Sequence, residues 1–182
     1  MINIQTLYQE AIKFATYRHL EKKQKVKGTN LPYVVHLSNV AMEILIAAHN
    51  TENFNLDYAI QVALLHDTIE DTNTTYEEIV EHFGLDIADA VMALTKNEKL
   101  PKEQQTQDSL TRIKKLSIEV WAVKLADRIT NLQPPPSNWN NQKRIKYQEE
   151  ARLILDELKY GNGYLAKRLK EKIEEYGEYI SN

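Results

Sequence analysis

Residues 63–71, with the sequence ALLHDTIED, join the most apolar segment of the chain to a cluster of ionisable side chains. On a helix that continued through this stretch, His66, Asp67, Glu70 and Asp71 would share one arc, because successive residues are about 100° apart. Burying three carboxylates and an imidazole side by side is strongly unfavourable unless a cation holds them. One interpretation is therefore a metal site. The other is a helix end that reaches the surface, with its acids in water.

The rest of the chain is poor in residues that break helices. Its 182 residues include five glycines and five prolines, and 42% of them are hydrophobic, so a sizeable core can form without disulfides. We therefore expect a single all-α domain, a bundle of about eight helices with a core over about residues 4–160. Specific expectations are one helix over 56–71, a polar loop over 96–107 and a C-terminal helix over 164–176.

Charge is distributed unevenly along the chain. Residues 13–27 hold six lysines and arginines against one acid, whereas residues 28–95 hold eleven acids and no lysine or arginine. A basic edge beside an acidic middle suits a divalent cation that meets a phosphate-bearing ligand, although solvated helix faces would give the same pattern. His19, next to the basic block, is expected to be exposed.

Composition excludes several classes of protein. The net charge of −3 argues against a protein that coats nucleic acid, which needs a basic surface. The chain has no cysteine, which excludes disulfides, thiolate metal sites and cysteine nucleophiles. Because no apolar run approaches the roughly 20 residues of a membrane span, we expect no membrane partner and a cytoplasmic location.

Two further residues complete a possible set of metal ligands. His36 follows Pro32-Tyr33 on an apolar helix pattern, where a hydrogen-bonded core histidine is the ordinary alternative. Asp127 lies among apolar residues, so it either pairs with Arg128 or serves something buried. Two histidines and two aspartates from three segments suit Mn²⁺, Fe²⁺ or Zn²⁺.

The order of these residues resembles that of the HD superfamily of metal-dependent phosphohydrolases. Within it, the chain is similar to small alarmone hydrolases and to the hydrolase domain of Rel/SpoT enzymes. The resemblance extends over about residues 4–160 and implies a helical HD domain. The segments that carry it are 31–36, 63–72, 94–96, 123–132, 138–139 and Tyr147.

The resemblance implies an enzyme that hydrolyses the 3′-pyrophosphate of guanosine tetra- or pentaphosphate, releasing pyrophosphate and GDP or GTP. It implies one divalent metal ion, Mn²⁺ first, with the ligands His36, His66, Asp67 and Asp127. Glu70 and Asp71 are expected to position or deprotonate the attacking water. The residues expected to contact the nucleotide are Lys23, Lys25, Lys96, Arg128, Asn131 and Tyr147.

Two positions depart from the family pattern. An arginine that the family usually has in the loop at residues 22–28, thought to stack on the base, is absent here, and Leu37 replaces a proline. Lysine does not replace arginine in stacking, so the base preference is open. The alternatives are an HD phosphohydrolase acting on an adenosine alarmone or a deoxynucleotide, or a nucleotide sensor without catalysis. The sensor would be expected to have lost a ligand or an acid, and none is missing. The length leaves no room for a synthetase domain, so we expect a hydrolase alone.

Overall fold

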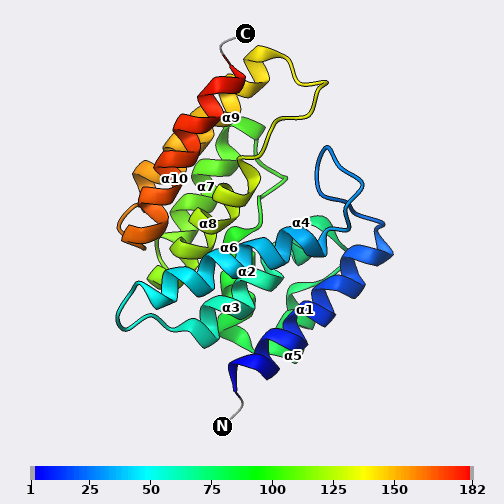
Figure 1. The fold of residues 1–182 in the computed structure, drawn as a ribbon. Coiled ribbons are helices and arrows are strands. Elements are labelled where there is room, and N and C mark those ends of the chain that lie inside the picture. The colour runs from blue at the N-terminus through cyan, green and yellow to red at the C-terminus, as the bar shows by residue number, and fades with distance from the viewer. Residues whose placement is uncertain (1–2, 181–182) are drawn as a thin grey trace.

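The computed structural model describes residues 3–180, and within them it contains helices and no strand, which confirms the all-α expectation. The helices are α1 (Ile4–Glu21), α2 (Val34–His49), α3 (Leu56–Leu65), α4 (Thr68–Asp71), α5 (Tyr76–Phe83), α6 (Leu85–Leu94), α7 (Lys102–Ile113), α8 (Ile118–Asn131), α9 (Asn141–Leu158), α10 (Gly163–Tyr176) and the 3₁₀ helix η1 (Gly177–Tyr179). Figure 1 shows the chain from α1 to α10. Across residues 3–180, no helix has the length and apolar character that a membrane span requires.

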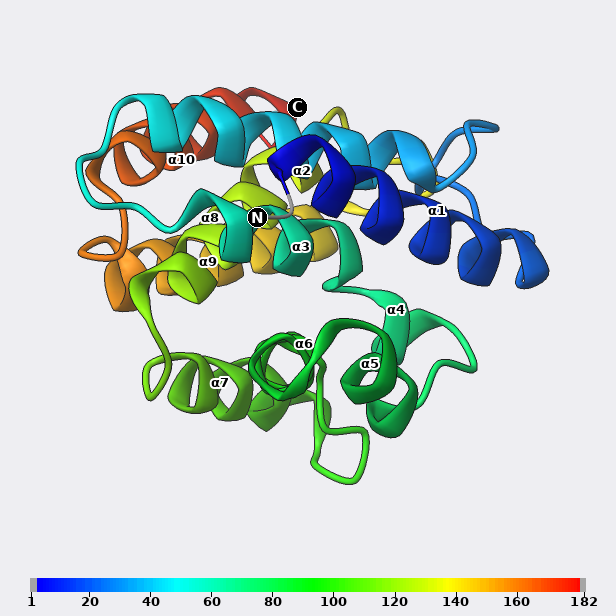
Figure 2. The same cartoon turned by 90° about the horizontal axis from the view of Figure 1, so that it is seen from below.

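The helices form three groups. Figure 2 shows α5, α6 and α7 on one side of the molecule and α1, α2 and α10 on the other, with α3, α8 and α9 between them. The middle position of α3 explains its sequence, because a helix that is apolar on most sides must be enclosed. Its buried residues are Ala59, Ile60, Val62, Ala63, Leu64 and Leu65.

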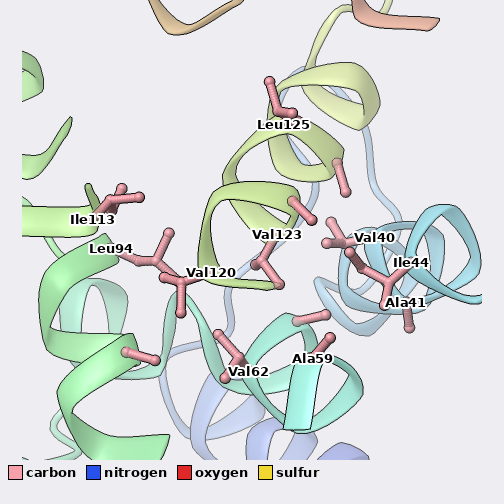
Figure 3. Close-up of a cluster of buried hydrophobic side chains, with 14 of the residues drawn as sticks. Val40, Ala41, Ile44, Ala59, Val62, Leu94, Ile113, Val120, Val123 and Leu125 are labelled. Atoms are coloured by element: carbon pink, nitrogen blue, oxygen red, sulfur yellow. The ribbon is translucent and has the colours of Figure 1, made fainter. Parts of the chain in front are cut away.

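Helix α8 connects the core on its two sides. Val123 lies near Val40 of α2, while Val120 lies toward Leu94 of α6 (Figure 3). Each of these side chains is buried, and burying a side chain of this size contributes roughly 1.5–3 kcal/mol relative to leaving it exposed. The packing therefore fixes where the last turns of α8, which carry Asp127, lie relative to α2 and α3.

The expected helix over residues 56–71 is wrong, because it is interrupted. α3 ends at Leu65 and α4 begins at Thr68, so this segment forms two helices in place of one. Two side chains compete with the helix for its carbonyl groups: the Thr68 hydroxyl donates to Leu65 O at 2.7 Å, and the His66 ring donates to Ala63 O at 2.8 Å. Such local hydrogen bonds satisfy carbonyl groups at a helix end and so stabilise the break.

The expected loop over residues 96–107 is also wrong in its second half. α7 begins at Lys102, directly after Pro101, and only Ser109, Leu110 and Ile113 of this helix are buried. Its first two turns face solvent, so they carry polar helix formers and show no apolar periodicity.

Candidate metal centre

The break between α3 and α4 places His66 and Asp67 side by side. Consecutive residues on one helix diverge by about 100°, but here Nε2 of His66 lies 2.9 Å from Oδ2 of Asp67. The expectation that Asp67 shares one helical arc with His66 is therefore wrong. The two residues lie in a turn, in which their adjacent side chains face one centre.

His36 from the first turn of α2 and Asp127 from α8 complete this centre. One ligand atom from each of His36, His66, Asp67 and Asp127 lies within 4.8 Å of the other three. Nε2 of His36 is 3.4 Å from Nε2 of His66 and 3.4 Å from Oδ1 of Asp127. Because the His66 Nδ1–H donates to Ala63 O, its Nε2 has a lone pair that is free to coordinate a metal. This donor set of two imidazoles and two carboxylates, of which Asp67 is half-buried and the other three are buried, fits one divalent transition-metal ion.

The electrostatic field at this centre favours a positive charge. Burial by itself opposes ionisation, yet the carboxylates of Asp67 and Asp127 raise the pKa of His66 well above its ordinary value. In return, His66 holds the pKa of Asp67 below its ordinary range despite the same burial. A proton on the imidazole is thus stabilised at the position where a metal ion would supply the charge.

Side chains around the ligands orient them. The Tyr33 hydroxyl donates a short hydrogen bond to Oδ2 of Asp67, and Nδ2 of Asn131 donates to Oδ1 of Asp127 at 2.5 Å. Lys124 Nζ lies 3.2 Å from the other oxygen of Asp127. Although burial opposes ionisation of Asp127, the Lys124 ammonium holds the pKa of this carboxyl well below its ordinary value. Both aspartates are therefore held as carboxylates, the form that coordinates metal.

Glu70 and Asp71 lie on α4 and have different partners. Glu70 accepts from the backbone N–H of Lys96 at 2.8 Å and from its Nζ at 3.1 Å. Burial disfavours the Lys96 ammonium, but the Glu70 carboxylate outweighs it and raises the pKa of Lys96. Asp71 accepts from Nε2 of Gln24 at 2.7 Å and lines the same cavity as His36.

Comparison with known proteins identifies this arrangement. Residues 11–158 match the family model described as the HD domain. This chain belongs to the HD domain family. The matched range includes His36, His66, Asp67 and Asp127, and we refer to these four converging side chains as the HD centre.

Named relatives cover nearly the whole chain. A Xenopus tropicalis protein named guanosine-3′,5′-bis(diphosphate) 3′-pyrophosphohydrolase MESH1 is 34% identical over 176 residues, which are 94% of this chain and 95% of that one. The MESH1 of Danio rerio is 33% identical over 173 residues, covering 92% and 93%. A solved structure described as a metazoan ortholog of SpoT that hydrolyzes ppGpp has a TM-score of 0.81 and 28% identity, over 94% of this chain and 96% of that chain.

A cavity of about 310 Å³ opens beside the HD centre. Much of its wall comes from two segments that are far apart in sequence, the loop between α1 and α2 and the proline-containing loop between α8 and α9, which lie at the same end of the molecule in Figure 1. Three residues expected to contact substrate line it: Lys25, Asn131 and Tyr147.

The outer part of this cavity is cationic and aromatic. The ammonium groups of Lys27 and Lys143 each lie 4.5 Å from the centre of the Trp139 ring, and both Lys27 and Trp139 line the cavity. Partial burial, together with the cations Lys143 and Lys96, lowers the pKa of Lys27. Repulsion between Lys27 and its neighbouring cations would be relieved by an anionic ligand, so this part of the cavity suits phosphate groups.

The other three residues expected to contact substrate lie elsewhere. Lys96 is paired with Glu70, and Arg128 is buried, with its Nη2 on Glu150 and its guanidinium carbon 4.7 Å from the centre of the Tyr147 ring. Lys23 is exposed at the end of α1 and is not among the residues that line the cavity.

Sequence reasoning missed several residues around the site. In the sequence, Tyr33 and Trp139 stand out only as parts of segments that resemble the HD superfamily, and Lys27 only as one charge of the basic block. Gln24 had no signal, because its partner Asp71 lies 47 residues away. The expectation that His19 is exposed is wrong: it is only 2% exposed, because its ring packs 4.6 Å from the Tyr33 ring.

Proposed function

We propose that this HD-domain protein is a metal-dependent hydrolase that removes the 3′-pyrophosphate of guanosine tetra- and pentaphosphate, producing GDP or GTP and pyrophosphate. The observation that carries the proposal is the convergence of two histidines and two aspartates, three of the four buried, beside a cavity lined by a further carboxylate and by lysines. The names of relatives that are 33–34% identical over more than nine-tenths of this chain support the same reaction.

The residues divide the work of the reaction. His36, His66, Asp67 and Asp127 would hold the ion, and the ion when bound supplies Lewis-acid chemistry, stabilising negative charge on phosphate and favouring deprotonation of water. Asp71 accepts the proton of the attacking water, whose oxygen bonds to the phosphorus next to the 3′ oxygen. The bond between that phosphorus and the 3′ oxygen then breaks, the 3′ oxygen gains a proton, and pyrophosphate leaves.

Other side chains bind and orient the substrate in this proposal. Lys25, Lys27 and Lys143 stabilise the phosphates, while Asn131 of α8 and Tyr147 of α9 also line the cavity. Glu70, held by Lys96, orients the water, and Arg128 holds the Tyr147 ring in place. Lys23 lies outside the cavity and contributes only long-range charge.

Three further assignments belong to the same proposal. Mn²⁺ is the ion that we favour, because the mixed nitrogen and oxygen ligands suit it. A cytoplasmic location is compatible with the absence of cysteine. A single domain over residues 1–182 is supported by the described helices α1 to α10, whose buried residues form one hydrophobic cluster.

The test is pyrophosphate release from ppGpp by metal-stripped protein, with and without added Mn²⁺, alongside Asp67→Ala. We expect release of pyrophosphate and GDP that depends on Mn²⁺. The variant should lose activity by roughly 10³-fold or more, since several kcal/mol of transition-state stabilisation depends on the ion. Asp156→Asn, an exposed change on α9, is the matched control and should remain fully active.

Substrates of other classes are tested in the same assay. The loop side of the cavity presents Lys25, Val26 and Lys27, so it offers no guanidinium plane for a base to stack on. An adenosine alarmone or a deoxynucleoside triphosphate hydrolysed faster than ppGpp would reassign the substrate. Metal binding without hydrolysis of any of these nucleotides would favour a sensor.

A further inference from the structure

At the end of α1, backbone hydrogen bonds fold the chain back toward His19. The N–H of Lys23 donates to Leu20 O at 2.9 Å, and the N–H of Gln24 donates to His19 O at 3.0 Å. The backbone φ of Lys23 is 52°, in the left-handed region. These bonds form a Schellman motif, in which the residue after the left-handed position commonly makes an apolar contact with the last turn of the helix. Here that contact is polar.

The side chains of His19, Gln24 and Asp71 form a chain of hydrogen bonds. Nδ1 of His19 lies 2.6 Å from Oε1 of Gln24, and Nε2 of Gln24 donates to Oδ2 of Asp71 at 2.7 Å. A carboxylate only accepts hydrogen bonds, so the amide group of Gln24 must face Asp71 and its oxygen must face His19. It follows that His19 carries its proton on Nδ1.

The surroundings of His19 keep this arrangement in place. The imidazole is 2% exposed, and its Nε2 has no hydrogen-bond partner among the described residues. A second proton would bury an N–H without an acceptor, which costs free energy, and burial accordingly lowers the pKa of His19. His19 is therefore a neutral imidazole whose Nδ1–H donates to Gln24.

Asp71 needs such a partner because little else holds it. It is the last residue of the four-residue helix α4, it is partly exposed, and the carboxylates of Asp67 and Glu70 repel it. Among the described side chains, Gln24 alone donates to it.

We propose that Gln24, fixed in turn by His19 at the end of α1, is a positioning residue that holds the Asp71 carboxylate toward the cavity beside the HD centre. The inference rests on the proposed function, in which Asp71 accepts the proton of water. The end of α1 thereby determines the geometry of a catalytic group on α4.

The test compares Gln24→Met, His19→Leu, His19→Asn and the double variant Gln24→Met/His19→Leu, with metal content measured for each. Gln24→Met keeps the length of the side chain and removes both hydrogen bonds. We expect its kcat to fall about 10- to 100-fold, the scale of a small misplacement of a catalytic group, with KM within about twofold of wild type. Gln9→Met, the same change at an exposed position of α1, is the control and should leave kcat unchanged.

The histidine variants test whether the two residues act through one chain. His19→Leu should lower kcat with no further loss in the double variant, since residues that act as a unit are non-additive. His19→Asn should recover most of kcat, because its amide nitrogen can donate from nearly the position of Nδ1. Effects of Gln24→Met and His19→Leu that multiply would overturn the inference, as would an unchanged kcat in Gln24→Met.

A second readout does not depend on activity. Nitrogen-15 spectra of the imidazoles should show His19 as the Nδ1–H tautomer in wild type, and a mixture or the Nε2–H tautomer in Gln24→Met. An Nε2–H tautomer in wild type would refute the chain of hydrogen bonds. An inactive wild type with His19 in the Nδ1–H form would refute the proposed function instead, together with the catalytic purpose of the chain.

Discussion

Three carboxylates within one site differ in their surroundings, and this divides their roles. Asp67 and Asp127 face imidazoles, and Asp127 also faces the Lys124 ammonium, so their pKa values lie below the ordinary range despite burial. Asp71 has no imidazole partner, and its partial burial together with the Asp67 carboxylate raises its pKa. The first two suit metal coordination, and the third is the better proton acceptor.

The hydrogen bond from Gln24 predicts a shift in the pH dependence of activity. This bond stabilises the charged form of Asp71 and lowers its pKa, against the raising effects of burial, Asp67 and Glu70, while Lys96 also lowers it. A base works only when deprotonated, so activity is lost as the pH falls through the pKa of Asp71. Gln24→Met should therefore move the acid limb of the kcat/KM profile to higher pH. A limb at the wild-type position in an otherwise impaired variant would contradict this.

At the scale of elements, the ends of helices position most of the side chains at the site. At the break at residues 66–67, the side chains of Thr68 and His66 donate hydrogen bonds to backbone carbonyls of the helix. The break places the side chains of His66 and Asp67 at one centre. The end of α1 places Gln24, and the first turn of α2 places His36. Helix interiors supply the rigid packing that holds these ends.

The left-handed conformation of Lys23 predicts a stabilising substitution. A side chain at a φ of 52° is strained, so Lys23→Gly should raise the free energy of unfolding by about 1 kcal/mol. For a domain of this size that corresponds to about 2–4 °C in Tm, measured by thermal unfolding. Because Lys23 does not line the cavity and contributes only long-range charge, KM for ppGpp should change little. A KM raised several-fold would instead return Lys23 to the substrate contacts expected from the sequence.

At the scale of the whole molecule, the HD centre joins elements that are separate in sequence. α2, the α3–α4 turn and α8 each contribute side chains to it, so an ion bound there would link the helices that form the core. The cavity beside it is lined by two distant loops together with residues of the helices near them.

Metal binding should therefore stabilise the entire fold. At an ion concentration 100 times Kd, one site contributes about 2.7 kcal/mol to the free energy of unfolding. This corresponds to about 5–10 °C in Tm for a domain of this length. Calorimetry with and without Mn²⁺ measures the shift, and Asp127→Asn should abolish it while Asp156→Asn keeps it. Equal shifts in both variants would show that the ion binds elsewhere.

Much of this could be predicted because it rests on local pattern. Apolar periodicity indicated the helices, and the residue types of His36, His66, Asp67 and Asp127 indicated a metal. The interruption before Thr68 was not predicted, because a threonine among good helix formers is compatible with either a helix or a helix end. The difference depends on whether its hydroxyl donates to a backbone carbonyl. The start of α7 was missed because its exposed turns have no apolar repeat.

The sequence by itself determined the all-α class and indicated the four residues that converge at the HD centre, since both depend on the kind and spacing of side chains. Only the tertiary structure decided that His19 is buried, that Gln24 reaches Asp71 and that Lys27 and Lys143 meet at Trp139. These contacts join residues far apart in the chain. Their formation depends on how the helices pack and where the loops end, which no local pattern specifies.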